Sequence, residues 1–348
     1  MTMIQWAEKG WMPDTLIRFG IRRLCQERLR DESRIVKQSE GESYQRRLES
    51  LRDSPIAIET EAANEQHYEV PAAFYELVLG SHLKYSSCWW DEATDSLNDA
   101  ERAMLEIYGK RAELEDGQEI LELGCGWGSL TLWMAEQYPK AKITAVSNSQ
   151  SQREFIEKQA RQRSLTNIQV ITCDVNELVL EQSFDRVVSV EMFEHVRNYQ
   201  QLFRNIQGWL KQDGKLFVHI FCHRRLLYPF ETEGEKNWMG RYFFTGGLMP
   251  SADTFHHFQQ DMKLEHQWYL SGTHYQRTAE AWLSNLDCHK QEVFRIFAEA
   301  YGEENAERWI QRWRMFFMSC AELFGYKGGR EWIVCHYLFN RQDGLTVN

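Results

Sequence analysis

The stretch EILELGCGWG, residues 119–128, carries the strongest local signal for the fold. It begins as a short apolar run and then breaks into glycines, a pattern typical of a buried strand that ends in a tight turn. Glycine lets the backbone approach a ligand closely and adopt conformations that a side chain forbids. The dinucleotide-binding fingerprint is G-x-G-x-x-G, whereas this turn reads G-x-G-x-G and has Ser129 at the last position. Alone, the turn is a weak signal for any one ligand.

Strands and helices alternate after this turn. Helical patterns cover 129–139, 150–164 and 199–214, and strand patterns cover 142–149, 167–175, 183–193 and 215–223. This alternation predicts an α/β fold, a doubly wound parallel sheet with helices on both faces. Two later strand candidates, 263–270 and 331–340, are separated by a helical pattern over 279–302. Ligands of such a sheet bind beyond the carboxyl ends of its strands, where the glycine turn lies.

The composition excludes several classes of protein. Asp and Glu outnumber Lys and Arg by 51 to 40, and the net charge of -11 argues against a nucleic-acid partner. The eight cysteines stand singly and form no cluster at metal-ligand spacing, so we expect no metal site and reduced thiols. No stretch approaches the ~20 apolar residues that span a bilayer, and the first residues lack a signal-peptide pattern. These features predict a cytoplasmic protein without membrane insertion.

The chain divides into four expected segments. Residues 1–110 form an amino-terminal helical segment that covers the cofactor, and 111–222 form the Rossmann-like core. Residues 223–262 are an aromatic-rich lid insertion, and 263–348 hold the final strands with their helical insertion. The amino-terminal helices are also candidates for the contact of a homodimer.

The glycine turn after ILEL resembles the first motif of class I S-adenosylmethionine methyltransferases. In such enzymes the next two strands end in contacts to the ribose and to the adenine. Asp174 and Val175, in TCDV, match the adenine contact. The ribose position departs from the usual acid, because Asn148 and Gln152 stand there, and amides form weaker hydrogen bonds than carboxylates do.

Longer blocks carry a more specific resemblance. HYEVPAAFYELVLG, LKYSSCWW, LELGCGWGSLTLW, VSNSQSQ, VEMFEH, RYFFTGGLMPS and AELFGYKGGREWIVCHYLF resemble the coclaurine N-methyltransferase-like enzymes, which are relatives of cyclopropane fatty acid synthases. The resemblance runs from about residue 66 to 341. It implies a class I methyltransferase fold and S-adenosylmethionine as cofactor. It also implies the cofactor-binding positions Tyr68, Tyr85, Ser86, Gly124, Gly126, Asn148, Gln152, Asp174, Val175 and Val190.

The VEMFEH block places Glu191, Glu194 and His195 at the end of a buried strand. Charged groups there are costly to bury without a function. The resemblance places them near the methyl group of the cofactor, with Glu191 typical of the amine-methylating branch. An alkylamine with a pKa near 10 loses its proton at pH 7 at a cost of about 4 kcal/mol, so a proton acceptor is needed. We expect His195 to be the general base and both glutamates to orient the substrate or share the proton. The alternative is structural: His195 and Glu194 would bond or cap the helix that follows.

The resemblance raises a second ligand. Cyclopropane synthases hold a bicarbonate ion through a Glu, a His, a Tyr and a Cys, and Glu194, His219 and Tyr275 match the first three positions. Ser87 occupies the cysteine position, with Cys88 displaced by one. Those synthases typically have glycine at the position of Glu191. The sequence leaves open whether bicarbonate binds here.

The lid insertion is rich in aromatic residues that suit an amine substrate. Trp238, Tyr242, Phe243 and Phe244 are candidates for a pocket that holds an aromatic or cationic amine, although each one could instead be part of the lid core. His219 and Tyr275 complete the expected substrate pocket. The reaction expected is N-methylation of a small-molecule amine.

Three alternatives remain from the sequence. One is methylene or methyl transfer to lipid acyl chains, and another is S-methylation of a thiol or thione heterocycle, which would depend less on His195. A third is a cofactor-binding sensor without turnover. The sequence leaves open the identity of the acceptor, the number of methyl groups and the oligomeric state.

Overall fold

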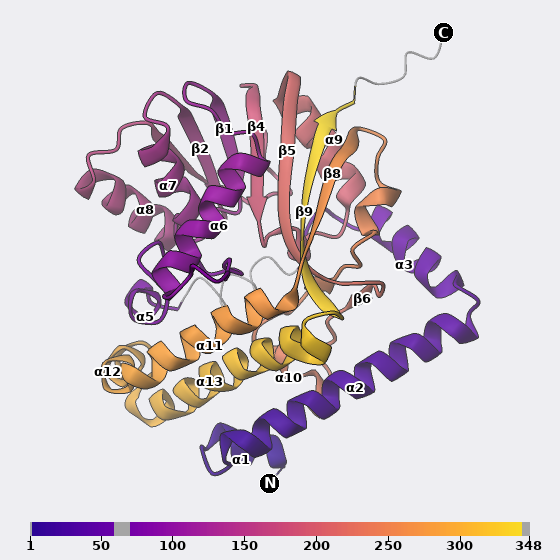
Figure 1. Cartoon of the computed structure of the whole chain (residues 1–348), viewed down its shortest axis with the longest axis vertical. Coiled ribbons are helices and arrows are strands. Elements are labelled where there is room, and N and C mark those ends of the chain that lie inside the picture. Colours follow the sequence, from indigo (N-terminus) through magenta and orange to yellow (C-terminus); the bar gives the residue numbers. More distant parts are fainter. Residues whose placement is uncertain (1, 59–69, 343–348) are drawn as a thin grey trace.

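A seven-stranded sheet forms the centre of the computed structural model, which describes residues 2–58 and 70–342 (Figure 1). The strand order is β3-β2-β1-β4-β5-β9-β8. The strands are β1 (Glu119–Leu123), β2 (Lys142–Ser147), β3 (Ile168–Thr172), β4 (Phe184–Val190), β5 (Leu210–His223), β8 (Met262–Leu270) and β9 (Trp332–Arg341). The predicted α/β fold is confirmed.

The sheet is mixed, which corrects the expectation of an entirely parallel sheet. The strands from β3 to β5 are parallel, whereas β9 runs antiparallel to β5 and β8 runs antiparallel to β9. The helices between β8 and β9 project beyond the end of the sheet instead of crossing one of its faces (Figure 1). A chain that returns from that end enters the sheet in the opposite direction, because a parallel pair needs a crossover.

Alternate residues of β1 and β4 face opposite sides of the sheet. Leu121 and Val187 belong to the core beneath α9 (Tyr199–Trp209) and α3 (Glu42–Arg52). Ile120 and Val188 belong to the core that includes α6 (Leu97–Arg111) and α7 (Ser129–Gln137). Both faces are therefore covered, as a central parallel sheet requires. The helix α8 (Gln150–Gln162) covers β2 and β3.

Side chains cap the starts of α8 and α9, and strand pairing sets the end of α9. The side chain of Ser149 caps α8, and that of Asn198 caps α9. The sequence predicts that α9 continues to Gly214, but the helix ends at Trp209 and β5 begins at Leu210. Leu210 is buried and pairs with Phe184, so this contact between strands outweighs the helical pattern.

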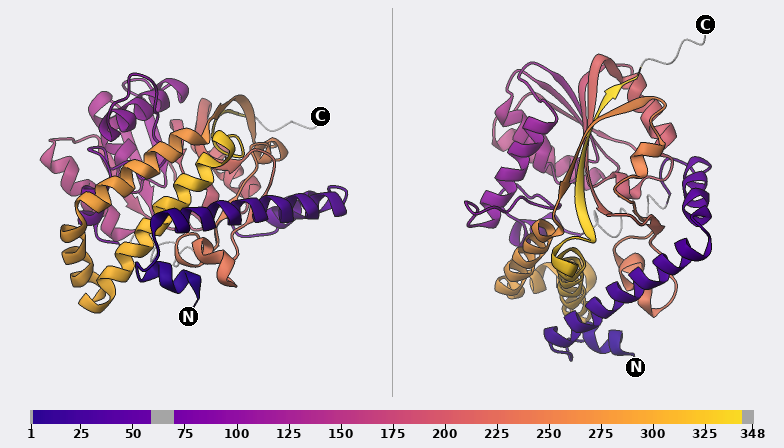
Figure 2. Two further views of the ribbon diagram at one scale, coloured as in Figure 1. Left: turned by 60° about the horizontal axis from the view of Figure 1, so that its bottom comes forward. Right: turned by 45° about the vertical axis from the view of Figure 1, so that its right-hand side comes forward.

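The amino-terminal helices are confirmed and lie along the carboxyl-terminal part of the chain (Figure 2). They are α1 (Met3–Glu8), α2 (Asp14–Gln38) and α3, and the short α5 (Ala72–Val78) follows the undescribed residues. Arg18 of α2 pairs with Glu280 at 2.6 Å and with Glu322 at 3.1 Å. Within the described part of the chain, no helix has the length and apolar character needed to cross a bilayer.

The last helices and most of the lid lie beyond the carboxyl ends of the parallel strands (Figure 1), whereas the turn Thr254–His257 packs on the sheet face beside α9. The lid contains β6 (Tyr228–Pro229), β7 (Leu248–Met249), α10 (Trp238–Tyr242) and the 3-10 turns Glu235–Asn237 and Thr254–His257. The helices α11 (Gly272–Cys288), α12 (Lys290–Tyr301) and α13 (Glu303–Gly325) and the 3-10 turn Tyr326–Gly328 follow β8. They bring residues distant in sequence to the strand ends.

Candidate active site

A cavity lies at the carboxyl ends of β1, β2 and β4. It is lined by the glycine turn, by the start of α8 and by the turn after β4. The lining residues are Ala57, Ile58, Leu123, Gly124, Gly126, Val146, Ser147, Asn148, Gln152, Cys173, Val175, Met192, His195 and Val196. Five of the expected cofactor positions thus meet in one cavity.

The glycine turn requires its glycines for two different reasons. Gly124 has φ of +79°, and a Cβ there would lie 2.7 Å from the Cβ of Met192. Gly126 has φ of +51° and no neighbour within 4 Å of an added Cβ, so its open side faces the cavity. The turn therefore presents bare backbone to a ligand, as S-adenosylmethionine requires.

We expect Gly124→Ala to weaken S-adenosylmethionine binding at least tenfold and to lower the free energy of unfolding by about 1 kcal/mol. The alanine would adopt a left-handed backbone and displace Met192 from the cavity wall. Calorimetric titration with the cofactor and thermal unfolding measure both effects. Gly208→Ala is the control, because an added Cβ there meets nothing within 4 Å. Equal affinities of the two variants would contradict the assignment of the turn.

The polar end of the cavity fits a nucleoside. Gln152 is buried and its side-chain oxygen accepts a 2.7 Å hydrogen bond from Ser147. Its Nε2 has no partner among the described residues, which leaves a buried donor for a ligand hydroxyl. Asp174 flanks the cavity between Cys173 and Val175, and its Oδ1 accepts a 2.8 Å hydrogen bond from the backbone of Asn176.

The segment before α6 brings Tyr85 and Ser86 to the carboxyl ends of the strands. The ring of Tyr85 packs 5.1 Å from that of Tyr75 and 5.5 Å from that of Trp282. The hydroxyl of Ser86 accepts a 2.6 Å hydrogen bond from Lys84, a fully buried lysine. Tyr68, also expected at the cofactor, lies outside the described residues. Val190 is half-buried at the end of β4.

Three donors from three parts of the chain hold the Glu191 carboxylate. Its Oε1 accepts from the Ser87 backbone at 3.0 Å and faces Nε2 of His219 at 3.1 Å. Its Oε2 accepts from the Tyr275 hydroxyl at 2.6 Å. Burial raises the pKa of Glu191 to about 6, against the effect of the Tyr275 and Ser87 hydrogen bonds and of nearby Lys84. The carboxylate is therefore mainly ionised at neutral pH.

Glu191 also adopts an unusual backbone conformation. Its φ is +48°, in the left-handed region, and this backbone conformation costs a residue with a side chain roughly 1 kcal/mol. Such strain persists where the surrounding structure holds it and is common at functional sites. The strained residue aims its side chain at the donors of Ser87, His219 and Tyr275.

Glu194 and His195 follow on the 3-10 turn η1 (Phe193–His195), in different environments. Glu194 is fully buried, and its Oε1 accepts a 2.7 Å hydrogen bond from the backbone of Phe221. Burial, and then the charge of Glu191, raise the pKa of Glu194 well above its usual value, which favours the neutral acid over the carboxylate. Burial lowers the pKa of His195 to about 4, which leaves its imidazole unprotonated. His195 lines the cofactor cavity.

The lid aromatics point in two directions. Trp238 donates a 2.9 Å hydrogen bond to Glu8 of α1, and Arg312 lies 4.2 Å over the ring of Tyr242. Phe243 stacks on Phe316 of α13 at 4.3 Å. Phe244 reaches the VEMFEH turn, where its ring stacks on that of His195 with 6.1 Å between the ring centroids. The structure brings Phe244 to the acid–imidazole cluster and packs Trp238, Tyr242 and Phe243 against α1 and α13.

Some lining residues carry no signal in the sequence. Ala57 and Ile58 reach the cavity because Ala57 bridges to Val196 and binds the side chain of Asn176 at 3.1 Å. Nothing in the local sequence indicates this long-range contact. Met192 could have been identified, since it lies inside VEMFEH and against the glycine turn.

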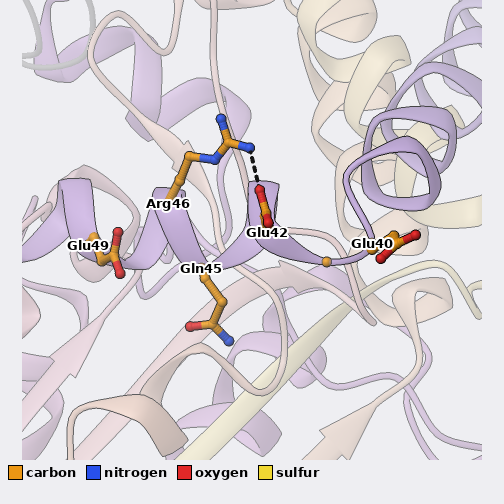
Figure 3. A pocket seen from close by; sticks show the side chains of 6 residues that line it. Glu40, Glu42, Gln45, Arg46 and Glu49 are labelled. Atoms are coloured by element: carbon orange, nitrogen blue, oxygen red, sulfur yellow. Dashed lines mark hydrogen bonds and ion pairs between the residues drawn. The ribbon is translucent and has the colours of Figure 1, made fainter.

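A second hollow lies at the surface, where α2 meets α3 (Figure 3). Its lining includes Glu40, Glu42 and Glu49 and the ion pair between Arg46 and Glu42 at 2.9 Å. It contains none of the expected site residues, and we assign no function to it.

Comparisons with known proteins agree with this site. The family model described as mycolic acid cyclopropane synthetase matches residues 57–331. The chain is 39% identical to (S)-coclaurine N-methyltransferase of Thalictrum flavum subsp. glaucum over 98% of this chain and 95% of that protein. It is 33% identical to pavine N-methyltransferase of the same plant, with coverages of 98% and 96%.

A solved structure extends the likeness to three dimensions. The crystal structure of coclaurine N-methyltransferase bound to N-methylheliamine and SAH matches with a TM-score of 0.93 and 38% identity, covering 97% of this chain and 99% of that one. The resemblance seen in the sequence blocks is confirmed. The chain belongs to the mycolic acid cyclopropane synthetase family and, within it, to the coclaurine N-methyltransferase-like enzymes.

Proposed function

We propose that this enzyme transfers a methyl group from S-adenosylmethionine to the nitrogen of a small aromatic amine. The observation that carries the proposal is the ionised Glu191 carboxylate, held by donors beside an unprotonated His195 at the cofactor cavity. An anion there attracts a cationic amine, and a neutral imidazole accepts its proton. The relatives named for methylating coclaurine and pavine support the same reaction class.

Proton removal is the main task of the protein's own residues. The cofactor, when bound, supplies an electrophilic methyl carbon on a positively charged sulfur. The amine lone pair forms the new N–C bond while the S–C bond breaks and its electron pair stays on sulfur. An ammonium has no lone pair, so it must first lose its proton. We assign this proton to His195, because Glu191 favours the protonated form of that imidazole.

The two glutamates take different parts. Glu191 is the anion that orients the ammonium group and stabilises protonated His195. Glu194 has one carboxyl oxygen with no partner among the described residues, and its raised pKa favours the protonated form. A pair of acids with separated pKa values is a common arrangement for handling a proton. We propose that Glu194 shares the proton with Glu191 as the reaction proceeds.

The acceptor is proposed to lie under the lid, against aromatic rings. Phe244 stacks on His195 and also on Phe230 at 5.2 Å, so a ring-bearing amine that reaches His195 meets its face or edge. Tyr275 stacks on Phe324 at 4.3 Å and closes the other side of Glu191. Trp238, Tyr242 and Phe243 form the outer part of the proposed pocket. Aromatic faces also favour a cationic nitrogen.

Bicarbonate does not fit this site. The resemblance assigns the ion to the positions of Ser87, Glu194, His219 and Tyr275. Ser87, His219 and Tyr275 already contact the carboxylate of Glu191. A bicarbonate ion would place a second anion beside Glu191 with those donors occupied. We therefore propose that the side chain stands where the ion would bind and that the reaction proceeds without it.

We expect purified protein with labelled S-adenosylmethionine to methylate ring-bearing secondary alkylamines, which are ammonium ions at neutral pH, and to leave unsaturated phospholipid vesicles unlabelled. Thione and thiol heterocycles are assayed in parallel at the same concentration. Turnover of amines should exceed that of the other two classes by at least a hundredfold, since only an ammonium uses both Glu191 and His195. Removal of bicarbonate by degassing should leave the rate unchanged. Preferential labelling of lipid or thione would overturn the proposal.

A further inference from the structure

A buried chain of side chains continues from Glu191 to the carboxyl-terminal end of α6. His219 faces Glu191 through Nε2, and its Nδ1 lies 2.8 Å from Nε2 of His336 on the adjacent β9. Nδ1 of His336 lies 2.7 Å from a guanidinium nitrogen of Arg111, the last residue of α6. Both histidines are fully buried. Neither His336 nor Arg111 contacts the cofactor cavity.

The donor and acceptor groups determine which nitrogen carries each proton in this row of hydrogen-bonded side chains. Arginine can only donate, so Nδ1 of His336 accepts from Arg111. A neutral His336 must then carry its proton on Nε2 and donate it to Nδ1 of His219. His219 therefore carries its own proton on Nε2 and donates it to Glu191. All donors point toward the carboxylate.

Two further observations agree with neutral, ordered imidazoles. Burial lowers the pKa of His219 and of His336 well below the usual value, and the positive charges of Arg111 and Lys84 act in the same direction. The hydroxyl of Tyr108 lies 2.8 Å from Nδ1 of His219. Because His336 already donates to this nitrogen, which has a single lone pair, Tyr108 cannot accept a proton from it and can only donate to it in competition with His336.

We infer that Arg111 and His336 are positioning residues, which hold His219 in the tautomer protonated at Nε2 and thereby keep Glu191 an anion. Their role rests on the proposed function of Glu191 in binding the ammonium group. Arg111 is half-buried and lies 4.9 Å over the ring of Trp268, which fixes its guanidinium against β8. The row of hydrogen-bonded side chains thus begins at a permanent cation, Arg111, and ends at the carboxylate of Glu191.

Loss of Arg111 should reverse the direction of the hydrogen bonds that link His336, His219 and Glu191. Without a donor at Nδ1, His336 can carry its proton there and accept at Nε2. His219 would then donate from Nδ1 and turn a lone pair toward Glu191, which favours the protonated carboxyl group. Tyr108 loses the charge of Arg111, which lowers the pKa of its hydroxyl in the wild-type protein. The side chains of the other titratable groups near Glu191 are retained in this variant, as is that of Tyr108: Lys84, Cys88, Tyr108, Glu194, His195, Tyr275 and Cys320.

The first test is the pH profile of turnover in Arg111→Met. We expect the acid limb to move up by about one pH unit and turnover at pH 6.5 to fall about threefold, with the dissociation constant of S-adenosylmethionine unchanged. Arg111→Lys, which can still donate, should restore most of the profile. Arg186→Met is the matched control, because Arg186 binds the Ala112 carbonyl at the same helix end but sits at the far end of β4 from Glu191. Superimposable profiles for Arg111→Met and Arg186→Met would overturn the inference.

The second test needs no substrate and separates this inference from the proposed function. Nitrogen-15 NMR of histidine-labelled protein, assigned with His219→Gln and His336→Gln, reports the tautomer of each ring. We expect both residues to be neutral and protonated at Nε2 between pH 6.5 and 8. Protonation of His336 at Nδ1, or an imidazolium at either position, would overturn the inference even in an active enzyme.

Discussion

Replacing Glu191 by glutamine is expected to lower turnover of an amine at least a hundredfold while S-adenosylmethionine binding changes less than about threefold. The amide has the shape of the carboxylate but no charge, so it neither attracts the ammonium nor stabilises protonated His195. It also meets the donors of Ser87, His219 and Tyr275 with only one acceptor oxygen. Steady-state kinetics and calorimetric titration with the cofactor measure the two quantities.

The pH dependence identifies the same group. Glu191 is ionised above its pKa of about 6, so wild-type turnover should fall as the pH drops through 6. The imidazole of His195, with a pKa of about 4, titrates too low to produce that limb. Glu191→Gln should lose the limb together with most of its activity. Glu119→Gln, at the other end of the sheet, is the control and should behave as wild type. Wild-type turnover in Glu191→Gln would remove the basis of the proposed function.

Glu191→Gly extends this test to the bicarbonate question. Glycine adopts the left-handed conformation at φ of +48° without the backbone strain of glutamate, which offsets part of the cost of removing the carboxylate. It also leaves Ser87, His219 and Tyr275 without their shared acceptor. If the side chain stands in for an anion, millimolar bicarbonate should restore part of the lost turnover in this variant alone. Stimulation of the wild-type enzyme by bicarbonate would contradict the proposed replacement.

The fold was largely predictable because its signals are local. Strands ending at Leu123, Ser147 and Val190 and the glycine turn at Gly124 follow from short apolar runs and backbone requirements. The direction of β9 was not predictable, because alternation of strands and helices does not tell where a chain re-enters a sheet. The end of α9 at Trp209 depended on pairing of Leu210 with Phe184, a contact between distant residues.

The sequence predicts which residues form the site, but it does not predict the role of each residue. Glu191, Glu194 and His195 are neighbours in the sequence, so their proximity was expected. Burial raises the pKa of both glutamates and lowers that of His195, and donors up to about a hundred residues away, such as the backbone of Ser87 and the hydroxyl of Tyr275, oppose the shift at Glu191. The lid shows the same limit: composition indicates aromatic rings, but only the packing selects Phe244 as the ring beside His195.

Replacing His195 by alanine is expected to lower turnover of a strongly basic amine by a hundredfold to a thousandfold, since a general base contributes about that much. Burial lowers the pKa of the imidazole to about 4, and it also lowers that of an ammonium group bound in the same site. The proton can therefore pass between them without the full difference seen in water. An aromatic amine with a pKa near 5 arrives already neutral and needs no acceptor.

The two amines distinguish proton removal from packing. If His195 is the base, His195→Ala should slow the basic amine at least tenfold more than the weakly basic one, and the difference should shrink as the pH rises toward the pKa of the basic amine. Phe244→Leu is the control, because it removes the ring that stacks on His195 and leaves the imidazole in place. It should affect both amines equally. Equal losses for both amines in His195→Ala would mean that the imidazole only shapes the pocket. The proton would then have to pass to Glu191, the neighbouring carboxylate that is mainly ionised at neutral pH.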